Sequence, residues 1–86
     1  MTVEQNIAYY LGYSLNHYLA SDTDEPAGGP NYYGFLDKQG NFYIMKVTIS
    51  GDTQTIRYMR GTGLALYQTS WSDRANLTYK YASEIF

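Results

Sequence analysis

The sequence predicts a mainly β domain, a small antiparallel sheet or sandwich with one short helix. Turn-forming residues divide the stretch 31–60 into three runs of alternating apolar residues. Tyrosine occurs 11 times in 86 residues, and aromatic side chains favour strands. One segment, near 64–74, repeats its apolar residues at helical spacing. A chain of this length forms a single domain, 1–86.

The first twenty residues fit two interpretations. Apolar residues recur at every fourth position, which favours a helix: Val3, Ile7, Leu11, Leu15 and Leu19. Residues 13–20 also alternate and are rich in tyrosine, which favours a strand. We expect a strand over 13–20, an arm or short helix over 1–12, and a polar loop with two prolines at 21–31.

Two turns set the register of an antiparallel meander over 31–60. Residues 37–40 (Asp-Lys-Gln-Gly) suit a type I turn that ends in a left-handed glycine. Residues 50–53 (Ser-Gly-Asp-Thr) suit a two-residue type II′ turn. Both turns place the same side chains on one face, which we expect to be the core face: Tyr33, Phe35, Tyr43, Met45, Val47, Ile56 and Tyr58.

The opposite face of the meander is also apolar, through Leu36, Phe42, Ile44 and Met59. A sheet that is apolar on both faces needs a second layer on each side or a partner. The same face sets Lys46 directly across from Arg57, which is unfavourable unless an acid joins them. We expect that acid to be Asp22, Asp24, Glu25, Asp73, Glu84 or a residue of a neighbouring subunit. The candidate interface residues are Leu36, Phe42, Ile44, Lys46, Arg57, Met59, Tyr9, Tyr10 and Tyr13.

The last third of the chain begins with a break at 61–63 (Gly-Thr-Gly). The apolar residues that follow recur at spacings of three and four, which predicts the short helix near 64–74. Trp71 is expected to lie buried over Ile44 or Met59, with the Arg74 guanidinium reaching the indole or a nearby carbonyl. Residues 77–81 alternate and predict a final strand.

The composition excludes several kinds of chemistry. Without cysteine there is no disulfide framework, zinc finger or thiol nucleophile. His17 is the single histidine, and nothing near it in sequence resembles a nucleophile elbow or a metal pair. Residues 22–25 resemble the opening of a calcium loop, but Pro26 and Ala27 replace the required oxygen ligand and glycine. We therefore expect no enzyme activity, no metal and no cofactor.

The charges divide the chain into two unequal parts. Residues 1–37 carry five acidic and no basic side chains, whereas residues 38–86 carry six basic and three acidic ones. Such a division suits head-to-tail contacts between copies, or it simply solvates one folded surface. The net charge of −2 argues against a nucleic-acid partner. The absence of a long apolar run argues against a membrane partner.

Three stretches together resemble a pattern in small proteins of tailed bacteriophages. They are residues 32–35 (Tyr-Tyr-Gly-Phe), 37–46 (Asp-Lys-Gln-Gly-Asn-Phe-Tyr-Ile-Met-Lys) and 71–79 (Trp-Ser-Asp-Arg-Ala-Asn-Leu-Thr-Tyr). The resemblance covers residues 31–81 and implies a virion or tail-associated component, made in the cytoplasm of a bacterial host. It brings no catalytic residues with it.

We therefore expect a non-enzymatic structural component of a tailed-phage virion at the tail, fibre base or capsid exterior. Its expected partners are other copies of itself and other virion proteins. One alternative is a glycan- or ligand-binding module in which exposed tyrosines stack on sugar rings, with candidates Tyr9, Tyr10, Tyr13 and Tyr18. A third option is a small regulatory protein that binds a host factor. Residues 1–20 carry more apolar surface than one chain covers, so deletion of 1–12 is expected to abolish assembly but not folding.

Overall fold

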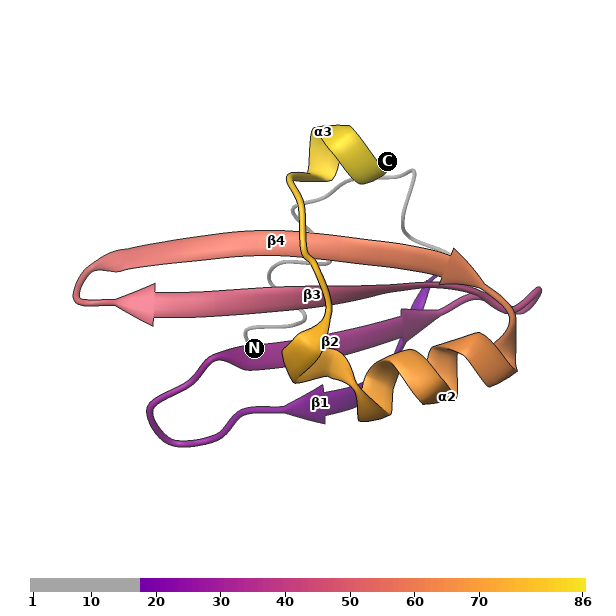
Figure 1. Cartoon of the computed structure of the whole chain (residues 1–86), viewed down its shortest axis with the longest axis horizontal. Helices are drawn as coiled ribbons and strands as arrows, with labels where there is room; N and C mark the ends of the chain where they lie inside the picture. Colours follow the sequence, from indigo (N-terminus) through magenta and orange to yellow (C-terminus); the bar gives the residue numbers. More distant parts are fainter. Residues whose placement is uncertain (1–17) are drawn as a thin grey trace.

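The computed structural model describes residues 18–86, which form a four-stranded antiparallel sheet followed by short helices (Figure 1). The strands are β1 (Leu19–Asp24), β2 (Asn31–Leu36), β3 (Asn41–Ser50) and β4 (Thr53–Thr62), and each pairs with the next in chain order. The helices are α2 (Leu64–Ser72), the 3-10 turn η2 (Arg74–Asn76) and α3 (Ala82–Ile85). The predicted fold class is confirmed, in the form of one sheet with flanking helices.

The two predicted turns set the register of the sheet as expected. The β2–β3 turn places Tyr33 opposite Met45, and Gly40 has the left-handed φ of 89° that such a loop requires. The β3–β4 turn places Met45 opposite Tyr58, and Gly51 has a φ of 59°. Cross-strand neighbours share a face, so the expected core face is formed.

That core face holds a buried cluster of Tyr33, Phe35, Tyr43, Met45, Val47 and Tyr58. Ile56 is partly buried against the cluster, as are Ala82 and Ile85 of α3. The Phe86 ring lies edge-on to Tyr43, with ring centres 5.1 Å apart. The helix α3 and Phe86 therefore supply part of the layer over this face.

The opposite face holds a second buried cluster, formed by Tyr32, Phe42, Ile44 and Tyr67. Tyr67 comes from α2, and Trp71, Leu77 and Tyr79 pack against the cluster from the same side. This placement corrects the contact role expected for Phe42 and Ile44, which are 1% and 0% exposed. Their own chain covers them, because α2 folds back across the sheet (Figure 1).

Two boundaries differ from the sequence-based expectation. β1 runs on to Asp24, so the loop before β2 spans 25–30 rather than 21–31. The expected final strand at 77–81 is replaced by an extended segment in which Lys80 alone bridges to Tyr58. Figure 1 shows this segment crossing the sheet toward α3 instead of running along β4. The expected helix or arm at 1–12 lies outside the described residues, as does the part of the expected strand that precedes residue 18.

Candidate protein interaction surface

A row of charged and aromatic side chains crosses the sheet on the α2 side. The register places Asp24 opposite Tyr32, Tyr32 opposite Lys46, and Lys46 opposite Arg57. Directly opposed residues point to the same face of a sheet. Four strands thus contribute one residue each to a single line with an acid at one end and two cations at the other.

Arg74 closes the acidic end of this row. Its guanidinium forms an ion pair with Asp24 at 2.8 Å and donates to the Trp71 carbonyl oxygen at 2.7 Å. The guanidinium also lies 4.6 Å from the centre of the Trp71 ring. The sequence-based prediction that Arg74 reaches the indole or a carbonyl is confirmed in both forms. Arg74 does so from η2, just beyond the end of α2 at Ser72.

Tyr79 spans the middle of the row. Its hydroxyl donates to the Arg74 carbonyl oxygen at 2.9 Å, and its ring centre lies 6.1 Å from that of Tyr32. The Lys46 ammonium is 5.6 Å from the centre of the Tyr79 ring. Burial raises the pKa of the Tyr79 hydroxyl above its ordinary value, so this ring remains a neutral platform for Lys46.

Arg57 ends the row against the face of Tyr81. The guanidinium carbon lies 3.9 Å from the centre of that ring, and Nη1 donates to the Ile56 carbonyl oxygen at 2.8 Å. The acid expected to join Lys46 and Arg57 is not found within residues 18–86, where the ion pair is Arg74–Asp24. Aromatic faces attract cations through the ring quadrupole without cancelling their charge. Both cations are thus held in place and remain positive.

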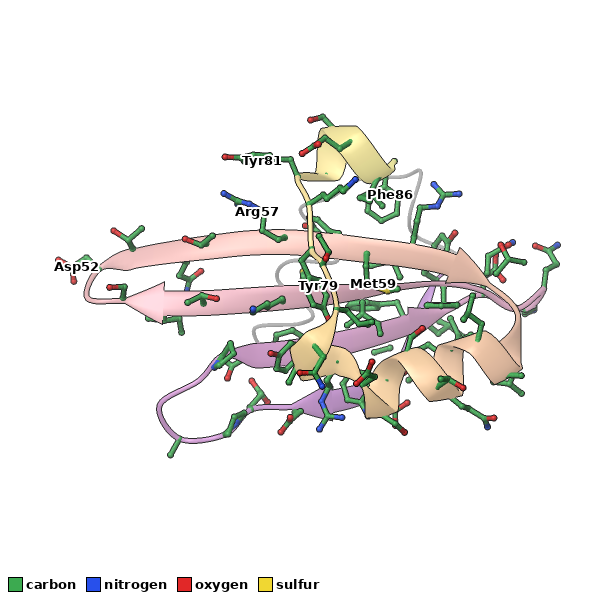
Figure 2. The ribbon with its side chains drawn as sticks, viewed as in Figure 1. Asp52, Arg57, Met59, Tyr79, Tyr81 and Phe86 are labelled. Carbon is green, nitrogen blue, oxygen red and sulfur yellow. The ribbon has the colours of Figure 1, made fainter. Side chains whose placement is uncertain are left out.

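More cations gather where residues 80–86 pass the outer edge of β4. Lys80 is joined to Tyr58 by two backbone hydrogen bonds of 2.7 and 2.8 Å. Arg60 lies 5.6 Å from the Phe86 ring centre and donates to the Ile85 carbonyl oxygen at 3.0 Å. Figure 2 shows Arg57, Tyr81 and Phe86 along this side of the molecule. We call Arg57, Arg60, Lys80, Tyr81 and Phe86 the basic edge.

The two rings of the basic edge are open to solvent. Tyr81 is 58% exposed and Phe86 is 42% exposed. One acid lies nearby, Glu84 of α3, whose carboxylate accepts the backbone N–H of Tyr81 at 3.3 Å. The basic edge therefore presents arginine, lysine and aromatic groups along the β4 side of the sheet, with Arg57 on the α2 face and Arg60 on the opposite face.

The opposite edge of the sheet is acidic. We call Asp22, Asp24 and Glu25, at the end of β1, the acidic edge. Each of these carboxylates already has an internal partner: Asp22 accepts the hydroxyls of Tyr67 at 2.6 Å and of Ser21 at 3.3 Å, and Glu25 accepts the Tyr33 hydroxyl at 2.8 Å. Within residues 18–86 only Asp24 of these three is paired with a cation, so among the described residues most of the negative charge at this edge is retained.

The other sequence-predicted interface residues lie elsewhere. Leu36 and Met59 are partly buried against the second cluster, and a contact between either and a partner stays a prediction. Tyr9, Tyr10 and Tyr13 lie outside the described residues, as does His17. Tyr18 is half-buried, with its ring edge-on to Tyr43 at 5.1 Å.

Sequence reasoning missed the role of residues 79–81. The signal is present in Tyr79-Lys80-Tyr81, where a lysine stands between two aromatic residues. An extended chain sends alternate side chains in opposite directions, so a crossing segment can offer a backbone bridge at one position and ring faces at the next. The alternation of residues 77–81 favours a strand, so it does not indicate that the segment crosses the sheet.

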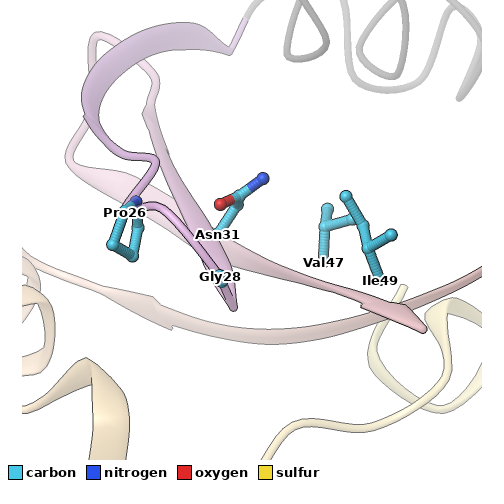
Figure 3. A pocket seen from close by; sticks show the side chains of 6 residues that line it. Pro26, Gly28, Asn31, Val47 and Ile49 are labelled. Atoms are coloured by element: carbon cyan, nitrogen blue, oxygen red, sulfur yellow. The ribbon is translucent and has the colours of Figure 1, made fainter. Parts of the chain in front are cut away.

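No described feature resembles a catalytic or metal centre. The concavity in Figure 3, of about 270 Å³, is lined by Pro26, Gly28, Gly29, Asn31, Val47 and Ile49, which include no ionisable side chain. Residues 18–86 contain no group of three or more His, Asp or Glu side chains placed to hold a metal. Within that same range, no helix is long and apolar enough to span a membrane. Comparison with protein families, curated proteins and solved structures finds no match for this chain.

Proposed function

We propose that this chain is a non-enzymatic structural component of a tailed-phage virion that acts through protein–protein contacts. The observation that carries the proposal is the basic edge, where the exposed Arg60 and Lys80 and the half-buried Arg57 lie beside two exposed aromatic rings along the β4 side. Arginine and aromatic side chains are enriched at protein interfaces, and they dominate the binding energy there. The fitting partner surface is acidic.

The basic edge contributes little to the stability of the isolated fold. Exposed cation–π contacts are worth only about 0.5–1 kcal/mol each, and the opposed cations Lys46 and Arg57 repel each other. An acidic partner would offset this repulsion and cover the exposed rings. Contact with an acidic partner would therefore supply the negative charge and the cover over the rings that the isolated chain lacks.

The arrangement of tyrosines favours assembly over glycan binding. Between residues 18 and 86, five tyrosines are buried and Tyr81 alone is mostly exposed. The face of Tyr81 is occupied by Arg57. A sugar-binding platform requires several accessible ring faces, and the described part of the chain offers no such stripe.

The virion setting is supported by the resemblance of residues 31–81 to small proteins of tailed phages. The stretches that carry it form β2, most of β3, and the α2–η2 junction with the segment after it. These stretches supply most of the buried residues of both clusters, so the resemblance concerns the scaffold on which the basic edge is built.

A mass-spectrometric census of density-purified virions tests the proposal. The virions come from a phage whose copy of this gene is either unchanged, Arg57→Ala/Lys80→Ala, or Lys38→Ala. Lys38→Ala removes one exposed cation from the β2–β3 turn, away from the basic edge. We expect the unchanged chain and the control at constant stoichiometry, and at least about tenfold depletion of the double variant. Absence of the unchanged chain from virions, when it is abundant in the lysate, contradicts the proposal.

A further inference from the structure

The order of the strands places the acidic edge and the basic edge on opposite sides of the sheet. β1 and β4 are the outer strands of the order β1-β2-β3-β4. The acidic edge belongs to β1 and the residue after it, and the arginines of the basic edge belong to β4. The chain therefore carries an acidic surface and a basic surface that cannot meet within one copy.

We infer that the acidic partner of the basic edge is the acidic edge of a second copy of this chain, docked head to tail. This inference rests on the proposed function and names the partner for the same surface. A twofold contact between two β4 edges would bring Arg57, Arg60 and Lys80 against their own copies, and one between two β1 edges would bring the acids together. Like charges set against each other across an interface are unfavourable and select against such contacts. Only the head-to-tail contact joins opposite charges.

The antiparallel meander is compatible with repeated addition in one orientation. Adjacent strands alternate in direction, so β1 and β4 of one copy run in opposite directions. A second copy in the same orientation then presents its β1 antiparallel to the first copy's β4. A head-to-tail contact of this kind closes into a ring or continues as a filament.

The contact is made mainly by side chains. The outward backbone groups of Tyr58 are already bonded to Lys80, and the Ile56 carbonyl oxygen accepts from Arg57. A continuous intermolecular ladder along β4 is blocked at these positions. Charge attraction between exposed groups then dominates, so association should weaken steeply with salt, whose screening length falls to about 3 Å at 1 M.

Two single-edge variants test the inference. Arg57→Ala/Lys80→Ala removes charge from the basic edge and keeps the backbone bridge of Lys80. Thr23→Lys adds a cation to the acidic edge at an exposed position of β1 that lies opposite Tyr33. Lys38→Ala is the control, and thermal melting establishes that every variant is folded. Light scattering after size-exclusion chromatography then gives the mass of the full-length chain at several protein and salt concentrations.

We expect the mass of the wild-type chain and of the control to rise with protein concentration and fall in 1 M salt. Each single-edge variant should associate about tenfold more weakly with itself. An equimolar mixture of the two variants should form a 1:1 complex, because each supplies the edge that the other lacks. A monomeric wild-type chain, equal association of wild type and variants, or a mixture that remains monomeric overturns the inference. Virions that still contain the chain in that case leave the proposed function standing, with another acidic virion protein as partner.

Discussion

The Tyr67 hydroxyl donates a 2.6 Å hydrogen bond to the Asp22 carboxylate, which joins α2 to the outer strand β1. To reach it, the phenol passes over Gly34, which is paired with Asp22 in the adjacent strand. A Cβ at position 34 would overlap the Tyr67 hydroxyl and lie 3.0 Å from the ring carbon Cε1. Because Gly34 has no side chain, the Tyr67 phenol of α2 can pass over β2 and reach Asp22 of β1.

Tyr67→Phe should lower the free energy of unfolding by about 1–2 kcal/mol, because hydrogen bonds to charged groups are worth about 1.5–3 kcal/mol and Asp22 is partly rehydrated. Gly34→Ala should cost more, about 2–3 kcal/mol, since a packed contact must move. Combined, the two changes should cost less than their sum, because removing the hydroxyl makes room for the new methyl group. Urea unfolding of the wild type, the two single variants and the double variant measures these free energies. Strict additivity would show that the hydroxyl does not exclude a side chain at 34.

Stability should fall in alkaline solution. Burial raises the pKa of Tyr43, Tyr58, Tyr67 and Tyr79 above the ordinary value. Above pH 10 the unfolded chain therefore binds fewer protons at these positions than the folded chain does. The free energy of unfolding is unaffected by them below about pH 10 and decreases above it by up to about 1.4 kcal/mol per pH unit for each.

Urea unfolding at pH 8 to 11, with tyrosinate absorbance followed in parallel, measures the alkaline effect. Ionisation of the buried phenols should appear together with unfolding. Tyr67→Phe should reduce the slope by one group's contribution. A free energy of unfolding that stays constant from pH 10 to 11 would contradict the burial of these hydroxyls.

Arg74→Lys should destabilise the fold by about 1–2 kcal/mol. Lysine keeps the charge but cannot donate to Asp24 and the Trp71 carbonyl at once, as the guanidinium does. Asp24→Asn should cost less, since Arg74 keeps its contact with Trp71. Thermal melting in low and high salt separates the two variants, because only the ion-pair part is screened. Equal losses of stability in Arg74→Lys and Asp24→Asn would show that Arg74 stabilises the fold through the ion pair alone.

Asp37→Ala should cost about 1–2 kcal/mol through the β2–β3 turn. The carboxylate accepts the backbone N–H groups of Gln39 and Asn41 at 2.9 and 2.8 Å, and the Asn41 side-chain amide at 2.9 Å. Loss of such a side-chain cap costs about 1 kcal/mol in comparable settings. Gln39→Ala, at an exposed position of the same turn, is the control and should be close to neutral. Equal unfolding midpoints for Asp37→Ala and Gln39→Ala would show that the Asp37 carboxylate does not stabilise the turn.

The sequence predicted the local parts of the structure well. The register of β2, β3 and β4 depends on two short turns, and the residues of each turn nearly determine its geometry. The turns that contain Gly40 and Gly51 are therefore sufficient to predict which residues of the three strands lie opposite each other. The helix near 64–74 is also confirmed, although α2 ends at Ser72 and Arg74 lies in the separate 3-10 turn η2. Turn preferences and helical spacing depend on residues close together in the chain, so both can be recognised from the sequence without knowledge of the fold.

The candidate surface could be predicted only in part. Lys46 opposite Arg57 follows from the β3–β4 turn, but the pairing of Asp24 with Arg74 joins groups fifty residues apart. β1 also pairs with β2 through an irregularity near Ser21, which shifts its register by an amount the sequence pattern does not indicate. The route of residues 77–86 across the β4 edge depends on the packing of Leu77 and Ile85 against opposite faces of the sheet.

Zero-length cross-linking of an equal mixture of unlabelled and ¹⁵N-labelled chains tests the central claim most directly. A carbodiimide joins an amine to a carboxylate only when the two touch, and mixed isotopes in one cross-linked peptide pair prove that two copies are joined. The account predicts mixed-isotope pairs that link Lys80 to Glu25, lost in 1 M salt. Mixed-isotope pairs that link Lys80 only to Glu84, or Lys80 cross-links found only within single copies, would contradict head-to-tail assembly through the two charged edges.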